Sequence, residues 1–367
     1  MFNEITPERT FATFKAISDT RAPSLMARHT RGRVIARLIE EARSASDDTN
    51  ALVFRPNLHG SGAVALELGE RSRKPLWCFA HIDNISFLTG ERTASGEYAL
   101  TPFCEAKQND GRRAAQALGF DPVTKGTTLL ADGWLVTRSD VHTFEPAAGA
   151  PDLPLSTRVV YASSAEWDRT TGIVHGCIDD AAGATALTLA AMALAKSPTP
   201  VEALFVLTDE EEGPVAPGPQ AFARGSARLF HRTPRKSLPE LITVTDTHEA
   251  AAGSPRFGTG ACFAGYGSRA RGGVTPPALL HALRKFAGDL GTHGVQLVEH
   301  GEYFGRSDDA SAVLATQNVA LIGCPGAYAH FAQRPHVHID DLVNLAKSIA
   351  AFAQLAQDEA WRERVLE

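Results

Sequence analysis

The chain has 367 residues, a formal net charge of −6 and an apolar content of 44%. This length and composition permit a large domain with a sizeable core and a smaller second one, while the charge gives no electrostatic case for nucleic acid. Five scattered cysteines without CxxC spacing predict reduced thiols in a cytoplasmic protein. No signal-peptide pattern opens the sequence, and the longest apolar stretch, 181–195, is shorter than the roughly 20 residues of a membrane span. We therefore expect neither nucleic acid nor a membrane as partner.

The first part of the chain predicts a helix and two strands that end at a polar pair. Residues 26–45 form a charged amphipathic helical pattern, and 64–68 and 76–80 form apolar strands that we expect to pair. The second strand runs into His81 and Asp83, which would share one strand face. A carboxylate beside a ligating histidine fixes its tautomer and raises its basicity. The pair is therefore a candidate metal site, although His-x-Asp triplets also arise by chance.

A second domain is expected after this pair. From His81 to the next acidic motif, at Asp179, the chain runs 179 − 81 = 98 residues, whereas a strand-to-helix crossover needs about a dozen. Residues 127–130 and 134–137 flank Ala131-Asp132-Gly133 in a hairpin-like pattern, and 151–154 resembles a loop. We expect a small β-rich domain at 88–165, inserted into a larger domain formed by 1–87 and 166–367.

Asp179 and Asp180 precede a run of small helix formers at 181–196. Acidic residues suit a helix N-terminus, which carries partial positive charge, so simple capping by either aspartate is one interpretation. Two aspartates are more than a cap needs, which leaves a ligand role open.

Four carboxylates, Asp209 to Glu212, follow an apolar strand at 203–207 and precede Gly213. Like charges side by side repel one another unless solvent or cations compensate them. An exposed acidic turn is the alternative to a functional site.

Two later strands also end near polar residues. Residues 241–245 lead into Asp246, and 319–325 are followed by Tyr328-Ala329-His330. Each alone is compatible with a solvated strand end. The order His, Asp, Glu-Glu, Asp, His along the chain, however, matches a ligand set for two metal ions that share one carboxylate.

Nitrogen and oxygen ligands without thiolate suit zinc, and also cobalt or manganese. Two such ions about 3.5–4 Å apart polarise a carbonyl and make hydroxide available near neutral pH. A glutamate that is not a ligand can serve as general base.

The rest of the chain alternates strands and helices. Residues 278–290 and 342–356 are predicted helices, the second entered through capping acids, and the glycine-rich run 258–273 is interpreted as a strand with flexible turns. The chain is therefore predicted to be an α/β protein.

Five motifs resemble segments of the M42 metallo-aminopeptidases, the glutamyl and leucyl aminopeptidase family related to the M28 and M20 di-metal peptidases. The segments His81–Phe87, Asp179–Gly183 and Glu210–Gly213 resemble its His-x-Asp-Glu-Ile-Gly-Phe, Asp-Asp-Arg-x-Gly and Glu-Glu-x-Gly motifs. Thr245–Thr247 and Tyr328–His330 resemble its last two ligand segments. The resemblance runs from about residue 60 to the C-terminus.

The resemblance implies a role for each motif residue. His81 and Asp246 would hold one ion and Glu211 and His330 the other, with Asp179 bridging. Glu210 would be the general base, because Gly213 then falls where Glu-Glu-x-Gly requires it, although three consecutive glutamates allow a shift of one residue. Asp83, beside His81, would be the second catalytic residue.

The resemblance further implies a three-layer αβα catalytic domain with a mixed sheet, and makes a homo-oligomer plausible. The chain departs from the family at Ala181 and Ala327, which stand in place of arginines, and at 214–219. These departures leave the substrate pocket undefined.

Three functions compete. The first is an aminopeptidase that trims peptides, and the second is an N-deacylase or carboxypeptidase that uses the same metals. The third, a non-catalytic binding protein, is disfavoured by the complete set of glutamates and ligands. His175, His248 and Asp309 are further candidates for lining the site, with a structural role as the alternative for the two histidines.

Overall fold

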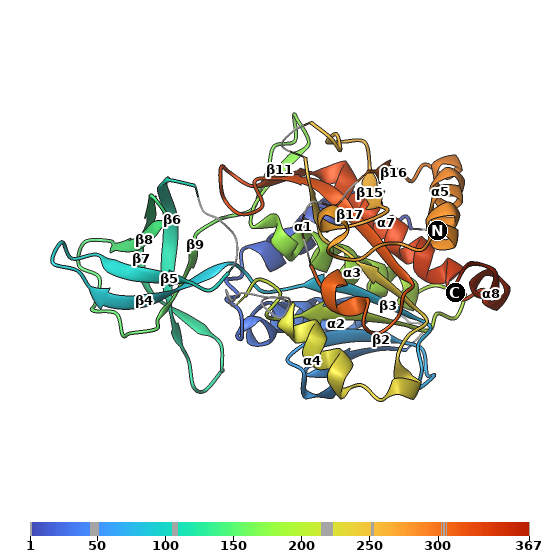
Figure 1. Ribbon diagram of the computed structural model, residues 1–367, viewed down its shortest axis with the longest axis horizontal. Helices are drawn as coiled ribbons and strands as arrows, with labels where there is room; N and C mark the ends of the chain where they lie inside the picture. Colours follow the sequence, from blue (N-terminus) through green and yellow to red (C-terminus); the bar gives the residue numbers. More distant parts are fainter. Residues whose placement is uncertain are drawn as a thin grey trace.

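The computed structural model describes residues 2–366 except 45–50, 105–108, 214–222, 251–252, 302, 304 and 306. Over these residues the chain forms a large α/β domain, here called the main domain, and a closed six-stranded antiparallel barrel beside it (Figure 1). Residues 214–219, where the sequence departs from the M42 family, lie outside the described residues.

A mixed sheet forms the middle of the main domain, as the sequence predicts. Its strands are β1 (Leu52–Arg55), β2 (Val64–Leu68), β3 (Leu76–His81), β10 (Glu166–Trp167), β11 (Ile173–His175), β12 (Ala203–Thr208), β13 (Leu241–Val244), β14 (Thr247–Glu249), β15 (Ala261–Ala264), β16 (Leu297–His300), β17 (Val319–Ala327) and β18 (His336–His338). The order is β1-β2-β12-β3-β13-β17-β18-β11-β10, with β14 and β15 also paired to β17 and β16 to β15. Four neighbours, β12, β3, β13 and β17, run parallel to one another.

The expected pairing of residues 64–68 with 76–80 is wrong. β12 lies between β2 and β3, antiparallel to the first and parallel to the second. Every residue of β3 is buried, as is usual for a strand with neighbours on both sides and both faces covered. Adjacency along the chain therefore misleads here, because β12 comes from far along the sequence.

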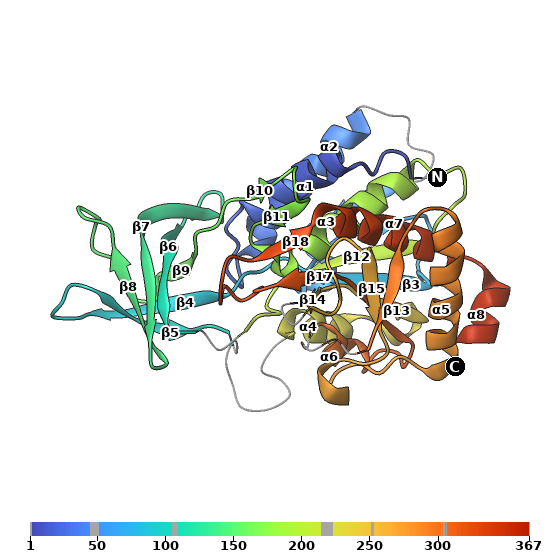
Figure 2. The same cartoon turned by 90° about the horizontal axis from the view of Figure 1, so that it is seen from above.

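Helices cover both faces of the sheet. They are α1 (Pro7–Ser18), α2 (Arg31–Ser44), α3 (Ile178–Ala195), α4 (Arg224–Arg232), α5 (Pro277–Thr292), α6 (Asp309–Ala312), α7 (Ile339–Leu355) and α8 (Glu359–Val365), with short 3-10 turns η1 (Ala27–His29), η2 (Leu58–Gly60), η3 (Arg235–Ser237) and η4 (Ser268–Ala270). Helices α1, α2, α3 and α7 lie on one face and α4 and α6 on the other (Figure 2). This is the expected three-layer αβα arrangement.

Helix α3 is the centre of the larger core. It is rich in alanine and leucine and packs against α7, α1 and β3. Its length and hydropathy would suffice for a membrane span, but all of it is buried inside the main domain, so it serves here as a core helix. A second core on the opposite face of the sheet includes Trp77, Phe79 and Leu229.

The barrel is the inserted β-domain that the sequence predicts. Its strands are β4 (Ser86–Arg92), β5 (Tyr98–Pro102), β6 (Gly111–Phe120), β7 (Thr127–Arg138), β8 (Val141–Pro146) and β9 (Arg158–Tyr161). They close in the order β4-β5-β8-β7-β6-β9 around an apolar core that includes Phe87, Leu135 and Phe144. Closure leaves no unpaired sheet edge.

The hairpin predicted around Ala131-Asp132-Gly133 is wrong, because β7 runs through these residues as one strand. The chain instead reverses at Ser139 and Asp140, which both have positive φ. A Cβ on Gly133 would come within 2.3 Å of the Glu145 carbonyl oxygen and 2.7 Å of the Phe144 ring. This glycine therefore marks a close approach inside a strand rather than a turn.

The barrel begins and ends next to the main domain. Its first strand, β4, pairs with its last, β9, through Ser86 and Val160. Both chain ends lie at the end of the main domain away from the barrel (Figures 1 and 2).

Candidate metal centre

Four neighbouring parallel strands deliver polar side chains to one edge of the sheet. His81 is the last residue of β3, the acidic run from Asp209 follows β12, Asp246 follows β13, and His330 follows β17. The carboxyl ends of parallel strands meet at one edge, which is where ligands bind in open α/β sheets.

Asp179 lies between two histidines at the start of α3. Its Oδ1 is 2.8 Å from Nε2 of His81, and its Oδ2 is 3.1 Å from Nε2 of His330. Asp180 has a different role, since its Oδ1 accepts a 2.7 Å hydrogen bond from the Gly183 N–H. Of the two interpretations of this motif, helix capping applies to Asp180 and a place in the site applies to Asp179.

Two groups of potential ligand atoms share Asp179. One consists of His81, Asp179 and Asp246, the other of Asp179, Glu212 and His330, and within each group the atoms lie within 4.8 Å of one another. Each group offers nitrogen and carboxylate oxygen, the donors that zinc accepts.

The three glutamates point in different directions. Glu210 has a φ of 63°, and its Oε2 accepts a 2.5 Å hydrogen bond from Nη2 of Arg228. Glu211 places Oε2 3.9 Å from Nε2 of His81, and Glu212 joins the group with His330. The predicted roles, Glu210 as base and Glu211 as ligand, stay predictions; the structure adds Glu212 as a third glutamate close to potential ligand atoms.

Asp83 joins two parts of the site. Its Oδ1 is 3.4 Å from Nδ1 of His81, while the Glu211 and Glu212 backbone N–H groups donate to its two oxygens. Ser24 adds a 2.6 Å hydrogen bond from Oγ. The expected pairing of His81 with a carboxylate is therefore present, and Asp83 also fixes the acidic turn.

Negative charge is concentrated in this site. Burial and the nearby Asp179 raise the pKa of Glu212 to about 8 and that of Asp246 to about 6. Burial and neighbouring carboxylates also raise the pKa of Glu211 well above its usual value. The buried Oε1 of Glu212 has no hydrogen-bond partner among the described residues. An excess of buried carboxylate with an unpaired oxygen fits bound divalent cations.

The two histidines respond to the same charges. Burial alone would lower the pKa of His81, but Glu211, Asp179 and Asp83 raise it well above its usual value. The contact with Asp179 likewise raises the pKa of His330, to about 9. The pKa of Asp179 is lowered, because hydrogen bonds from both histidines outweigh its burial.

Several supporting residues escape sequence reasoning. Tyr303 donates a 2.8 Å hydrogen bond from Oη to Oδ2 of Asp246. The backbone N–H groups of Leu25 and Ala27 donate to the two oxygens of Asp209, which ties the N-terminal segment to the acidic turn. Nothing in the local sequence around Tyr303 predicts its contact with Asp246. The run of carboxylates at 209–212, by contrast, marks the acidic turn in the sequence.

The remaining candidates have structural contacts. Asp309 accepts hydrogen bonds from the backbone N–H groups of Gly273 and Ser307. His248 is buried against His300 and Tyr303, and burial lowers its pKa to about 3. His175 packs against His336 on the neighbouring strand β18.

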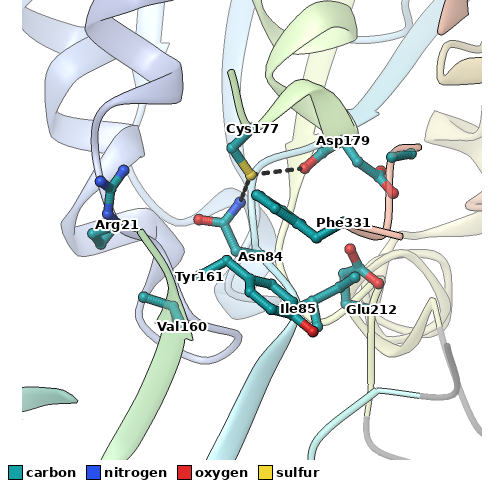
Figure 3. A pocket seen from close by; sticks show the side chains of 10 residues that line it. Arg21, Asn84, Ile85, Val160, Tyr161, Cys177, Asp179, Glu212 and Phe331 are labelled. Carbon is teal, nitrogen blue, oxygen red and sulfur yellow. Dashed lines mark hydrogen bonds between the residues drawn. The ribbon is translucent and has the colours of Figure 1, made fainter. Parts of the chain in front are cut away.

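A cavity opens beside Asp179 and Glu212, between the main domain and the barrel (Figure 3). Its volume is about 10 Å³, room for about one water molecule. The barrel contributes Val160 and Tyr161, and the loop after β17 contributes Phe331. Ligand-type nitrogen and oxygen atoms at the ends of parallel strands, next to a cavity, are typical of a metal-dependent hydrolase.

Comparison with known families supports this class. The family model described as "Peptidase family M20/M25/M40" matches residues 157–355, more than half of the chain. The chain belongs to this peptidase family, within the wider group of M20, M28 and M42 peptidases. No curated protein matches it in sequence.

Solved structures share the fold over nearly the whole chain. An aminopeptidase from the archaeon Desulfurococcus kamchatkensis has a TM-score of 0.74 at 16% identity, with 98% of each chain covered. A TET aminopeptidase from a marine sediment archaeon of the Thaumarchaeota has a TM-score of 0.70 at 15% identity, covering 96% of this chain and 99% of that one. The Pyrococcus horikoshii TET1 peptidase, described as able to assemble into a tetrahedron or a large octahedral shell, has a TM-score of 0.69 at 18% identity, covering 94% and 99%. At these identities the likeness establishes the fold.

Proposed function

We propose that the protein is a two-metal aminopeptidase that hydrolyses N-terminal residues from peptides. The observation that carries this proposal is Asp179, whose two carboxylate oxygens face His81 on one side and His330 on the other. A shared carboxylate between two nitrogen–oxygen ligand groups is what a pair of adjacent divalent ions requires. The names of the structural relatives favour aminopeptidase chemistry.

His81, Asp246 and Asp179 would hold one ion, and Glu212, His330 and Asp179 would hold the other. Zinc is the proposed metal, and the same donors accept cobalt or manganese. When bound, such a pair of ions polarises the scissile carbonyl and supplies hydroxide near neutral pH. Asp83 orients the His81 ring through Nδ1, so that Nε2 faces the site.

Glu211 is the proposed general base. It belongs to neither ligand group, yet its carboxylate faces the site at His81. Glu210, the alternative from sequence, is engaged with Arg228 instead. Glu211 takes a proton from the attacking water and delivers it to the departing amine.

We place the substrate beside the ligand groups, next to the small cavity in Figure 3. Its walls come from both domains, so the barrel takes part in substrate binding. We also propose a homo-oligomer in the cytoplasm, since related peptidases are described as a dodecamer and as larger shells.

The test combines metal analysis with a substrate panel of aminoacyl anilides, their N-acylated counterparts and C-terminally free peptides. We expect two divalent ions per chain and hydrolysis of the free-amine substrates, lost with chelator and restored by zinc. If only the N-acylated substrates were hydrolysed, the protein would be an N-deacylase instead. A chain that binds no metal and hydrolyses nothing would contradict the proposal.

A further inference from the structure

We propose that Arg113, on strand β6 of the barrel, is a positioning residue for His330 and thereby for the ligand group of Asp179, Glu212 and His330. The inference rests on the proposed two-metal function. It makes the inserted barrel part of one metal site, although the barrel contributes no residue to either ligand group.

The His330 side chain needs support from its loop. It is 47% exposed, so packing around the ring restricts it little. Tyr328, two residues before it, and Phe331, directly after it, have φ values of 59° and 60°, a left-handed conformation that is uncommon for non-glycine residues. The Phe331 N–H donates to the Tyr328 carbonyl at 2.8 Å, which closes a tight turn around His330.

Arg113 supplies the restraint. Its Nε donates a 2.5 Å hydrogen bond to the Phe331 carbonyl oxygen, and its Nη2 lies 3.4 Å from that of Ala332. Nη1 donates to the Asn109 carbonyl at 2.9 Å, so the guanidinium is anchored to its own domain. The planar fork of arginine suits several carbonyls at once, because its donors are fixed relative to one another.

A ring contact acts at the same point. Phe331 stacks on Tyr161 of strand β9, with ring centroids 4.4 Å apart and planes inclined by 20°. Tyr161 packs in turn edge-on against Phe87 in the barrel core. The base of the loop is closed by β17–β18 pairing of Ala327 with His336. The main domain thus fixes where the loop begins, and the barrel fixes its tip.

The test is a calorimetric titration of the metal-free protein with Zn²⁺ alone. Arg113→Ala is compared with Arg112→Ala, a matched loss of one arginine from β6. Arg112 is exposed, pairs with Glu145 and lies over the Trp134 ring. We expect wild type and Arg112→Ala to bind two ions alike, and Arg113→Ala to bind one ion normally and the other about tenfold more weakly, the effect of losing one charged hydrogen bond.

Two further variants separate positioning from general damage. Arg113→Lys, which keeps the charge but not the fork, should weaken the same ion by less than Arg113→Ala. In a His330→Ala background, Arg113→Ala should cause no additional loss of zinc affinity, because its effect passes through His330. The unfolding midpoint of metal-free Arg113→Ala should stay close to that of Arg112→Ala.

Normal binding of both ions by a folded Arg113→Ala protein would overturn the inference, and so would equal weakening of both. If Arg113→Ala does not fold, Arg113→Lys decides the question by the same titration. Failure of wild type itself to bind two ions would instead contradict the proposed function.

Discussion

The main domain and the barrel differ in what they bury. The main domain buries His81, Asp83, Asp179 and the run of four carboxylates at 209–212. Within the described residues of 86–161, the barrel buries no charged side chain, and its ion pairs, such as Arg112–Glu145, lie at the surface. The barrel has the polarity pattern of an ordinary small β-domain, and the main domain does not.

The difference locates the function. Burying a carboxylate costs several kcal/mol unless hydrogen bonds or cations compensate it. In the main domain the compensation is incomplete without an added cation, since Glu212 and Asp246 have raised pKa values. Changes at the buried carboxylates should therefore alter metal binding and turnover, whereas changes at exposed carboxylates of the barrel should alter stability or nothing.

The largest effect is expected from Asp179→Ala. It removes the carboxylate common to both ligand groups, so both ions should be lost and turnover should fall by far more than the 10–100-fold typical of residues that only support a ligand. Metal content by mass spectrometry and kcat are the measurements. The barrel control is Asp152→Ala, whose carboxylate is 85% exposed and paired with Arg92, and it should leave both unchanged. If Asp179→Ala retained two ions, the proposed difference between the main domain and the barrel in metal binding would be wrong.

The three glutamate variants come next. Glu211→Gln should keep both ions and lose about 10²–10⁴-fold in kcat, the usual contribution of a general base. Glu212→Gln should bind one of the two ions less tightly. Glu210→Gln should keep both ions and most turnover, because its carboxylate bonds to Arg228. If Glu210→Gln lost its turnover with both ions in place, the register expected from sequence would be the right one.

The metal-free protein should lose stability as pH rises from about 4.5 to 9. Glu212 and Asp246, with pKa values of about 8 and 6, keep their protons in the folded state at pH values where the unfolded chain has released them. His330, raised to about 9, contributes stability that is complete below its usual 6.5 and lost as pH passes 9. Both effects act in the same direction. Urea unfolding with chelator at pH 5, 7 and 9 measures the slope.

Added Zn²⁺ should reverse this trend over the same range, because the ligands must be deprotonated to bind it. A metal-free protein that gained stability between pH 5 and 9 would show that the buried carboxylates are compensated by other means.

The smallest effect is expected from Gly133→Ala in the barrel. The new Cβ would overlap the Glu145 carbonyl oxygen, which should lower the free energy of unfolding by about 1–3 kcal/mol. Metal content should not change, because the new Cβ meets Glu145 and Phe144 rather than Arg113 or Tyr161. Denaturant unfolding measures the loss. Loss of a metal ion in Gly133→Ala would contradict the separation of roles.

Sequence reasoning succeeded where local patterns determine structure. Strand 64–68 and the helix at 278–290 follow from apolar periodicity and appear at nearly the predicted positions. The helix predicted from residue 26 begins only at Arg31, after the 3-10 turn at Ala27–His29. His81, Asp246 and His330 lie together because the ends of parallel strands share an edge, and Asp179 joins them from the start of α3.

The misses have long-range causes. The position of β12 between two strands adjacent in sequence depends on the global order of the sheet. Three consecutive glutamates have no spacing that distinguishes them, so the sequence alone does not show which side chain bonds to Arg228. Tyr303 reaches Asp246 across 57 positions of sequence, and a short-range pattern cannot encode that contact.

The paired first and last strands of the barrel also bear on how the chain folds. His81 and Asp179 lie 98 positions apart in sequence, but β4 pairs with β9 and so joins the two ends of most of that span. Once the barrel has closed, only short connections separate the two residues. Shortening the loop fourfold lowers the entropic cost of bringing His81 and Asp179 together by roughly 1 kcal/mol, which is a modest contribution to stability. The effect on speed is more direct, because early barrel closure converts a long-range encounter into a local one, and folding rates rise as contacts become more local.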